Sequence, residues 1–332
     1  MTVIHGGNIW QGQGPEAWLD FSANLNPEGP PAWVREAMAQ GLSRANVYPD
    51  LTGAAARRGV AAHLGVPEEC VLVTAGGIEA AALAARRPGR HVVAQPTFQE
   101  YGRLCGDYQS VFREKLHEHR FSERENLWIC NPNNPTGDAL SRNFLSALLD
   151  RADCAGAGLV VDEAFIEYCP EHSVADLAAK RPSLTILGSL TKVLAIPGVR
   201  LGYIVAEANV TYALSEGFLP WRLNCVADAV AAALPGHRQD FDAIRRLNDT
   251  RRARFARGLE ALGARVYPSE ANFLLCDFGR DMRPTIERLR TRGMLVRPCG
   301  MFPGLDDGFV RLCVRTEAEN ARLLEALGDV RE

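Results

Sequence analysis

The chain has 332 residues, of which 47% are hydrophobic and 23% charged, and its formal net charge at pH 7 is −3. A chain of this length can bury substantial cores, which excludes a small scaffold that depends on disulfides or metals to fold. The near balance of charges excludes a broad basic surface for nucleic acid, and no apolar run reaches the roughly 18 residues of a membrane span.

Nine cysteines are scattered along the sequence, and no two of them lie closer than 14 residues apart. This spacing contains no CxxC clip for a metal or a redox centre, and scattered single thiols are typical of proteins in a reducing compartment. Residues 1–8 lack the basic and apolar regions of a signal peptide. We therefore expect a cytoplasmic protein with no metal, no nucleic-acid partner and no membrane partner.

The chain divides into three regions that differ in composition and in the pattern of their apolar residues. Residues 1–45 are rich in glycine, proline, asparagine and tryptophan, and they predict an extended arm with one short helix over residues 32–41. Residues 46–217 alternate short apolar runs with longer helical stretches, which predicts a large α/β domain. Residues 218–332 differ again in composition and apolar pattern, and they predict a smaller domain.

Six apolar runs of the second region predict its strands. The runs are continuous, without polar alternation, which is typical of strands that are buried on both faces of a mostly parallel sheet between helices. They cover residues 71–74, 91–95, 127–130, 159–162, 185–190 and 201–206.

The third region predicts an α+β fold that part of the N-terminal arm completes. A helical stripe of apolar residues runs through an arginine-rich stretch and consists of Ile244, Leu247, Phe255, Leu259 and Leu262. The basic residues within 245–257 predict a solvated helix face. Residues 271–276 and 309–314 are typical of short strands, and Thr316 with Glu319 forms a capping box that begins a final helix.

Glycines and polar residues follow several predicted strands, at the edge where parallel sheets bind ligands. Gly76 and Gly77 open a helix whose amide groups can meet a phosphate, and a tight turn without a ligand is the alternative. Asn134 lies in the rigid turn Asn-Pro-Asn-Asn-Pro-Thr-Gly (131–137), which would present its amide to a ligand oxygen. Asp162 closes a strand as a carboxylate that needs a protonated nitrogen or another cation nearby. A metal ion is the alternative partner of Asp162. No cluster of histidines or cysteines accompanies it in the sequence, which disfavours a metal site.

Lysine is rare in this chain, which has 34 arginines and only three lysines. Lys115 and Lys180 lie among charged neighbours, whereas Lys192 lies between a predicted strand and an apolar run. Burial lowers the pKa of a lysine toward the neutral, nucleophilic amine, and a buried ion pair is the alternative. An amine, a carboxylate, an amide donor and a phosphate site in strand order together meet the needs of pyridoxal 5′-phosphate.

These motifs resemble those of the fold-type I pyridoxal-phosphate enzymes, and the resemblance extends across essentially the whole chain. It is carried by residues 133–137, the turn Asp-Glu-Ala-Phe (162–165) and the string Ser-Leu-Thr-Lys (189–192). It implies that Lys192 forms the covalent bond to the cofactor, that Asp162 pairs with the pyridine nitrogen and that Asn134 bonds the ring oxygen. Further cofactor contacts implied by the resemblance are Gly76, Gly77, Ile78, Phe98, Phe165, Ser189 and Arg200. The same resemblance implies a homodimer in which Tyr48 reaches into the neighbouring subunit's site.

Within this family three sets of residues resemble threonine-phosphate decarboxylases of cobalamin biosynthesis, with histidinol-phosphate aminotransferases as near relatives. The sets are residues 5–8 with 19–27, residues 189–192 with 195–198, and residues 296–299 with 302–305 and Arg311. The resemblance implies a phosphorylated amino acid as substrate, O-phospho-L-threonine, which would lose CO₂ to give (R)-1-amino-2-propanol O-phosphate. The residues that would bind it are His5, Gly6, Asn24, Asn134, Arg297 and Arg311, with Arg311 on the carboxylate. Two alternatives stay open: an aminotransferase acting on histidinol phosphate or another amino acid, and a pyridoxal-phosphate-binding regulatory protein without turnover.

Overall fold

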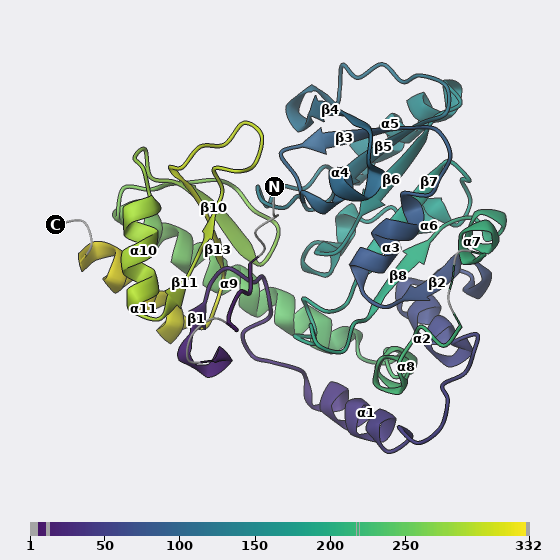
Figure 1. Cartoon of the computed structure of the whole chain (residues 1–332), viewed down its shortest axis with the longest axis horizontal. Helices are drawn as coiled ribbons and strands as arrows, with labels where there is room; N and C mark the ends of the chain where they lie inside the picture. Colours follow the sequence, from purple (N-terminus) through teal and green to yellow (C-terminus); the bar gives the residue numbers. More distant parts are fainter. Residues whose placement is uncertain (1–5, 11–13, 217, 219, 330–332) are drawn as a thin grey trace.

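The computed structural model describes residues 6–10, 14–216, 218 and 220–329 (Figure 1). It confirms the predicted α/β class, with a large domain around one sheet and a smaller domain beside it. Within these ranges no helix is both long enough and apolar enough to cross a membrane.

The large domain is built on a seven-stranded sheet with the strand order β2-β8-β7-β6-β5-β3-β4. Strand β8 runs antiparallel to both of its neighbours, and the other pairs are parallel. The strands are β2 (Val71–Thr74), β3 (Arg90–Gln95), β4 (Tyr108–Phe112), β5 (Glu125–Cys130), β6 (Gly158–Asp162), β7 (Leu184–Ser189) and β8 (Gly202–Val205). Each predicted run corresponds to one of these strands, whereas the edge strand β4 was not predicted.

Both faces of this sheet are buried, which explains the continuous apolar runs. On β5, Leu127 and Ile129 point into one core, while Trp128 and Cys130 point into the core on the opposite face. The first core is covered by α1 (Ala32–Leu42), α2 (Ala54–Leu64), α5 (Arg142–Cys154), α6 (Ala175–Ala178) and α8 (Cys225–Ala232). The second is covered by α3 (Gly77–Ala84), α4 (Glu100–Cys105) and α7 (Ala208–Ser215).

The smaller domain has its own core and two small sheets. A four-stranded sheet has the order β12-β13-β10-β9, and β1 pairs in parallel with β11, so the N-terminal arm contributes a strand to this domain. Its elements are β1 (Leu19–Asp20), β9 (Arg265–Val266), β10 (Phe273–Asp277), α10 (Arg283–Thr291), β11 (Met294–Leu295), β12 (Arg297–Pro298), β13 (Phe309–Cys313) and α11 (Glu317–Asp329). The predicted capping box is present: the Glu319 amide donates to Thr316 Oγ1 at 3.3 Å, and Glu319 Oε2 accepts from the Thr316 amide at 3.1 Å.

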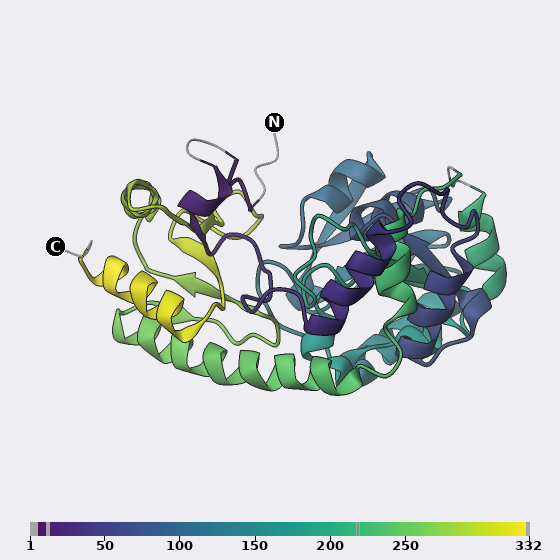
Figure 2. The same ribbon diagram turned by 90° about the horizontal axis from the view of Figure 1, so that it is seen from below.

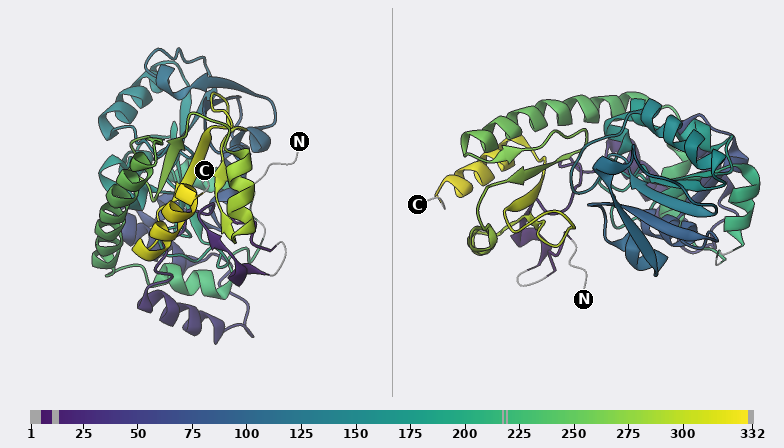
Figure 3. Two further views of the ribbon diagram at one scale, coloured as in Figure 1. Left: turned by 90° about the vertical axis from the view of Figure 1, so that its left-hand side faces the viewer. Right: turned by 90° about the horizontal axis from the view of Figure 1, so that it is seen from above.

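One 24-residue helix, α9 (Arg238–Ala261), extends along both domains (Figures 2 and 3). Its Phe241 lies in the core of the large domain, whereas Phe255 and Leu259 lie in the core of the smaller one. The predicted solvated face is wrong for Arg251, which is only 8% exposed. Arg251 forms ion pairs with Glu28 at 2.7 Å and Glu317 at 2.9 Å, partners that lie far away in the sequence.

The packing divides the chain elsewhere than at the predicted boundaries of 45 and 218. Leu223 and Val230 still lie in the core of the large domain, so the change of domain falls within α9. Helix α1 also packs on this domain, because Gly41 brings its backbone against the Cys225 carbonyl of α8. The change in composition near residue 218 does not show how the alanine-rich helix α8 packs, and the arginine-rich stretch itself begins only in α9.

Candidate active site

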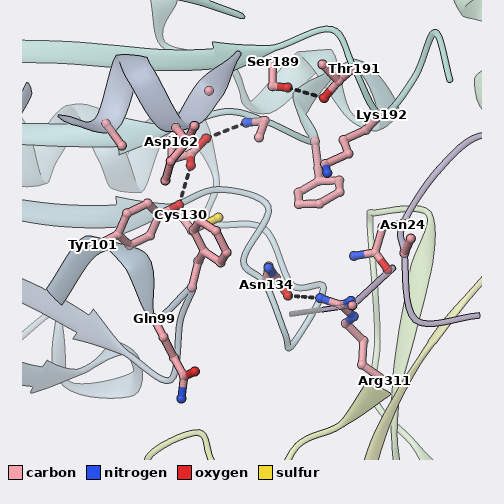
Figure 4. Close-up of a pocket in the computed structure, with 18 of the residues that line it drawn as sticks. Asn24, Gln99, Tyr101, Cys130, Asn134, Asp162, Ser189, Thr191, Lys192 and Arg311 are labelled. Atoms are coloured by element: carbon pink, nitrogen blue, oxygen red, sulfur yellow. Dashed lines mark hydrogen bonds between the residues drawn. The ribbon is translucent and has the colours of Figure 1, made fainter. Parts of the chain in front are cut away.

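A cavity of about 270 Å³ lies between the two domains, at the carboxyl ends of β5, β6 and β7 (Figure 4). Both domains and the N-terminal arm contribute side chains to it. The residues predicted from the sequence that line it are Gly6, Asn24, Gly77, Ile78, Phe98, Asn134, Asp162, Phe165, Ser189, Lys192, Arg200, Arg297 and Arg311.

Asp162 ends β6 and presents its carboxylate to the cavity. One carboxylate oxygen accepts a hydrogen bond from the Tyr101 hydroxyl, and the other accepts from the Ala164 amide at 2.8 Å (Figure 4). Burial raises the pKa of Asp162 above its ordinary value, while these two donors and the Lys192 cation oppose the rise. Such a carboxylate favours a protonated ring nitrogen as its partner, since that charge would replace the lost solvation.

Lys192 follows β7 and directs its amine into the same cavity (Figure 4). Burial is the main reason that its pKa falls from 10.5 to about 8, and the cations Arg311 and Arg200 lower it further, while Asp162 opposes the change. A lysine with this pKa is about one-tenth neutral at pH 7, and the neutral amine is the form that attacks an aldehyde.

A set of phosphate-binding groups lies at one end of the cavity. Helix α3 begins there at Gly77, after Gly76 with φ of 87°, so its first amide groups are free of intrahelical acceptors. The Ser189 and Thr191 hydroxyls lie 2.7 Å apart beside it. The Arg200 guanidinium lies so close to Gly76 that a Cβ there would be 2.4 Å from Arg200 Nη2. The positive φ of Gly76 favours glycine where the guanidinium meets the helix N-terminus, and together these groups fit a phosphate dianion.

Asn134 and Arg311 bond to each other across the domain boundary. Arg311 Nη1 donates to Asn134 Oδ1 at 2.5 Å, and Arg311 Nη2 donates to the Ser22 carbonyl at 2.5 Å. Because the oxygen of Asn134 is occupied, its amide nitrogen is the atom left to donate to a ligand oxygen. Burial lowers the pKa of Arg311 to about 10.

Two buried arginines line the cavity, and each has one guanidinium N–H group without a hydrogen-bond partner among the described residues. Arg297 Nη2 contacts Met301 Sδ at 3.3 Å, but Arg297 Nη1 and Arg311 Nε have no hydrogen-bond partner. The two arginines are 5% and 6% exposed, and neither forms an ion pair within the part of the chain described here. Buried cations without carboxylate partners favour a ligand that brings two anionic groups.

Several lining residues were not predicted from the sequence. These are Ser22, Ala23, Ala81, Gln99, Tyr101, Cys130, Ala164, Thr191 and Phe302. The position of Thr191 beside Lys192 was an available signal, whereas Tyr101 reaches Asp162 only because α4 packs over the sheet.

Two of the described residues that were predicted, Gly76 and Tyr48, do not line the cavity. Gly76 lies at its edge against Arg200, and His5 lies outside the described residues. Tyr48 is 79% exposed and packs against Trp221 with ring centroids 5.0 Å apart. Its role in a partner subunit therefore stays a prediction.

The fold and this cavity define a pyridoxal-phosphate enzyme, and comparison with known proteins identifies the family. The model of the family "Aminotransferase class I and II" matches residues 16–327, so the chain belongs to that family and its cofactor is pyridoxal 5′-phosphate.

Two kinds of enzyme stand among the relatives. Threonine-phosphate decarboxylase of Salmonella typhimurium is 34% identical, covering 98% of this chain and 96% of its own length. Histidinol-phosphate aminotransferase of Geobacillus thermodenitrificans is 32% identical, covering 93% and 89%. The solved structure of L-threonine-O-3-phosphate decarboxylase from Porphyromonas gingivalis superimposes with a TM-score of 0.85 at 27% identity, covering 94% of this chain and 98% of that one.

Proposed function

We propose that this enzyme decarboxylates O-phospho-L-threonine to (R)-1-amino-2-propanol O-phosphate in cobalamin biosynthesis. The observation that carries the proposal is the pair of buried arginines, Arg297 and Arg311, which line one cavity and have no carboxylate partner among the described residues. Phosphothreonine brings both a carboxylate and a phosphate to such a pair. The similarity to threonine-phosphate decarboxylases over nearly the full length of both chains supports the same substrate.

Residues at different positions in the cavity would hold different parts of the cofactor. Lys192 would hold the cofactor, Asp162 would keep the proton on its ring nitrogen, and the α3 N-terminus with Ser189 and Arg200 would hold its phosphate. The bound cofactor supplies an electron sink for the bond that breaks at the substrate Cα.

The substrate itself would be oriented by the two buried arginines. Arg311 would grip the carboxylate and Arg297 the phosphate, and this grip would decide which Cα bond faces the electron sink. As the C–C bond breaks, its electron pair would stay on Cα, the carboxylate would leave as CO₂, and a proton from the Lys192 ammonium would form a new C–H bond in its place. The product therefore retains the amine and the phosphate.

An aminotransferase is the second candidate, because a histidinol-phosphate aminotransferase is nearly as similar to the chain. Histidinol phosphate carries a phosphate but no carboxylate, so it would satisfy one of the two arginines. A dicarboxylate amino donor would satisfy both arginines. A direct assay therefore has to distinguish the decarboxylase from the aminotransferase.

The test is to incubate the purified holoenzyme with O-phospho-L-threonine, with and without 2-oxoglutarate. Release of CO₂ and aminopropanol phosphate in equal amounts without the keto acid supports the proposal. Glutamate formation that requires the keto acid identifies an aminotransferase, and no turnover by a yellow protein identifies a regulatory one. Lys192→Ala should abolish turnover, whereas the matched variant Lys180→Ala should retain it.

We also propose that the enzyme is a cytoplasmic homodimer. All nine cysteines are free, as expected in a reducing compartment. Large apolar side chains are exposed along residues 42–51 and at Trp221, which packs against Tyr48; they are Leu42, Val47, Tyr48, Leu51 and Trp221, and they are 50–79% exposed. A second copy of the chain would cover these side chains and bring Tyr48 to the partner's cavity. Sedimentation at micromolar concentration tests this, because a monomeric mass would contradict it.

A further inference from the structure

We propose that Arg113 is a positioning residue for Asn134. Arg113 directly follows the edge strand β4 and begins a short 3-10 helix (Arg113–Lys115). Its side chain is 8% exposed, and it does not line the cavity. Its influence on the site must therefore act through the groups that it bonds.

Among the described residues, all hydrogen-bond acceptors of the Arg113 guanidinium belong to the loop that carries Asn134. Its Nη1 donates to the Cys130 carbonyl at 3.0 Å, and its Nη2 donates to Asn131 Oδ1 at 3.1 Å. Its Nε donates to Asp138 Oδ2 at 2.7 Å, and Nη2 also reaches the Asp138 carbonyl at 3.3 Å. Cys130 and Asn131 form the entry of this loop and Asp138 its exit, so one side chain holds both ends.

The loop between these ends is closed by its own hydrogen bonds. The Asn133 amide donates to the Asp138 carbonyl at 2.9 Å, and the Gly137 amide donates to the Asn133 carbonyl at 2.7 Å. Asn134 lies inside this closed segment. Fixing the entry and exit therefore fixes the segment as one body, including the direction in which Asn134 presents its side chain.

The ion pair with Asp138 reinforces this arrangement. Burial alone would raise the pKa of Asp138, but Arg113 and the neighbouring hydroxyl of Thr136 hold it below its ordinary value. The carboxylate therefore stays charged at neutral pH and the link between the two ends persists. A lysine could not replace Arg113, because a single ammonium cannot reach four acceptors that are spread over both ends of a loop.

The consequence falls on the two bonds of Asn134. Its oxygen accepts from Arg311, and its amide nitrogen is directed into the cavity, where we assign it to the ring oxygen of the cofactor. A displaced loop would weaken that second bond without removing any group from the cavity. This inference rests on the proposed role of Asn134 and does not depend on which reaction the enzyme catalyses.

The test compares Arg113→Ala, Arg113→Lys, Asn134→Ala and the double variant Arg113→Ala/Asn134→Ala as holoenzymes. The readout is the pH midpoint at which the visible absorption band of the bound cofactor changes. A donor to the ring oxygen stabilises its anionic form, so losing this donor should raise the midpoint by about one to two pH units. We expect Arg113→Ala and Arg113→Lys to raise it, and the double variant to raise it no further than Asn134→Ala does.

Arg87→Ala is the matched control. Arg87 is a partly buried arginine with three acceptors, Asn126 Oδ1, Thr185 Oγ1 and the Pro182 carbonyl, but it lies at the opposite end of the strands. Its loss should lower the melting temperature and leave the absorption midpoint unchanged.

The possible results separate the two assignments. If Asn134→Ala leaves the midpoint unchanged, the role of Asn134 is wrong, and this inference fails with it. If Asn134→Ala shifts the midpoint but both Arg113 variants keep the original one, only the inference about Arg113 is overturned. Additive shifts in the double variant would also overturn it, because Arg113 would then act independently of Asn134. Should Arg113→Ala fail to fold, Arg113→Lys decides alone.

Discussion

The amine of Lys192 allows the electrostatics of the cavity to be measured directly. In protein freed of its cofactor, we expect this amine to titrate with a pKa of about 8, against an ordinary value of 10.5. The difference of 2.5 units makes the neutral amine roughly 300 times more abundant at pH 7 than in an ordinary lysine. Burial is the main cause, and the cations Arg311 and Arg200 add to it.

Two substitutions should move this midpoint in opposite directions. Arg311→Met removes a neighbouring cation, so the pKa of Lys192 should rise toward 10.5. Asp162→Asn removes the anion that favours the charged amine, so the pKa should fall further.

Competitive acetylation with a trace of reagent, followed by peptide mass spectrometry, reports each of the three lysines separately. Scaling each labelling curve to its plateau at high pH removes differences in access, and Lys115 and Lys180 provide comparisons within the same sample. A midpoint for Lys192 at or above about pH 10, or no response to Arg311→Met, would refute the reasoning.

Three further predictions concern stability and use denaturant unfolding. Gly59→Ala should destabilise the fold by about 1–3 kcal/mol, because a Cβ there would lie 2.0 Å from the Ala231 carbonyl, whereas Gly198→Ala, with open space around it, should be neutral; equal effects would contradict this. Burial raises the pKa of Glu163 from 4.5 to about 7, so the folded protein binds the extra proton between these values and loses up to about 3 kcal/mol of stability as the pH rises through them. Glu163→Gln should abolish that loss, and an unchanged pH profile would count against the assignment. Thr316→Ala should cost about 1 kcal/mol through the lost cap of α11, and a variant as stable as the parent would show that the cap contributes nothing.

The sequence predicted the strands that are buried on both faces and missed those that are not. Strands β2, β3, β5, β6, β7 and β8 each produce a continuous apolar run, because helices cover both of their faces. Strand β4 lies at the sheet edge with Tyr108 and Phe112 38% and 46% exposed, so its composition carries no such run. The two-residue strands β1, β9, β11 and β12 are too short to show a period.

In the candidate site, too, some residues could be predicted from the sequence and others could not. Asn134, Asp162 and Lys192 could be predicted because each follows a recognisable strand, and the ends of parallel strands converge. Tyr101 could not, because its bond to Asp162 depends on how α4 packs against the sheet. The burial of Arg251 depends equally on tertiary structure, since its acidic partners come from the two ends of the chain.

The long helix α9 limits where this chain can be joined to that of a relative in a chimera that exchanges one domain. At 1.5 Å per residue its 24 residues extend for about 36 Å, and its two halves complete different cores. A chimera joined inside the helix would have to match side chains from two parents in both cores at once. Grafting the smaller domain of a relative to change substrate preference therefore requires junctions before Arg238 and in the arm between β1 and α1, so that α9 is transferred whole.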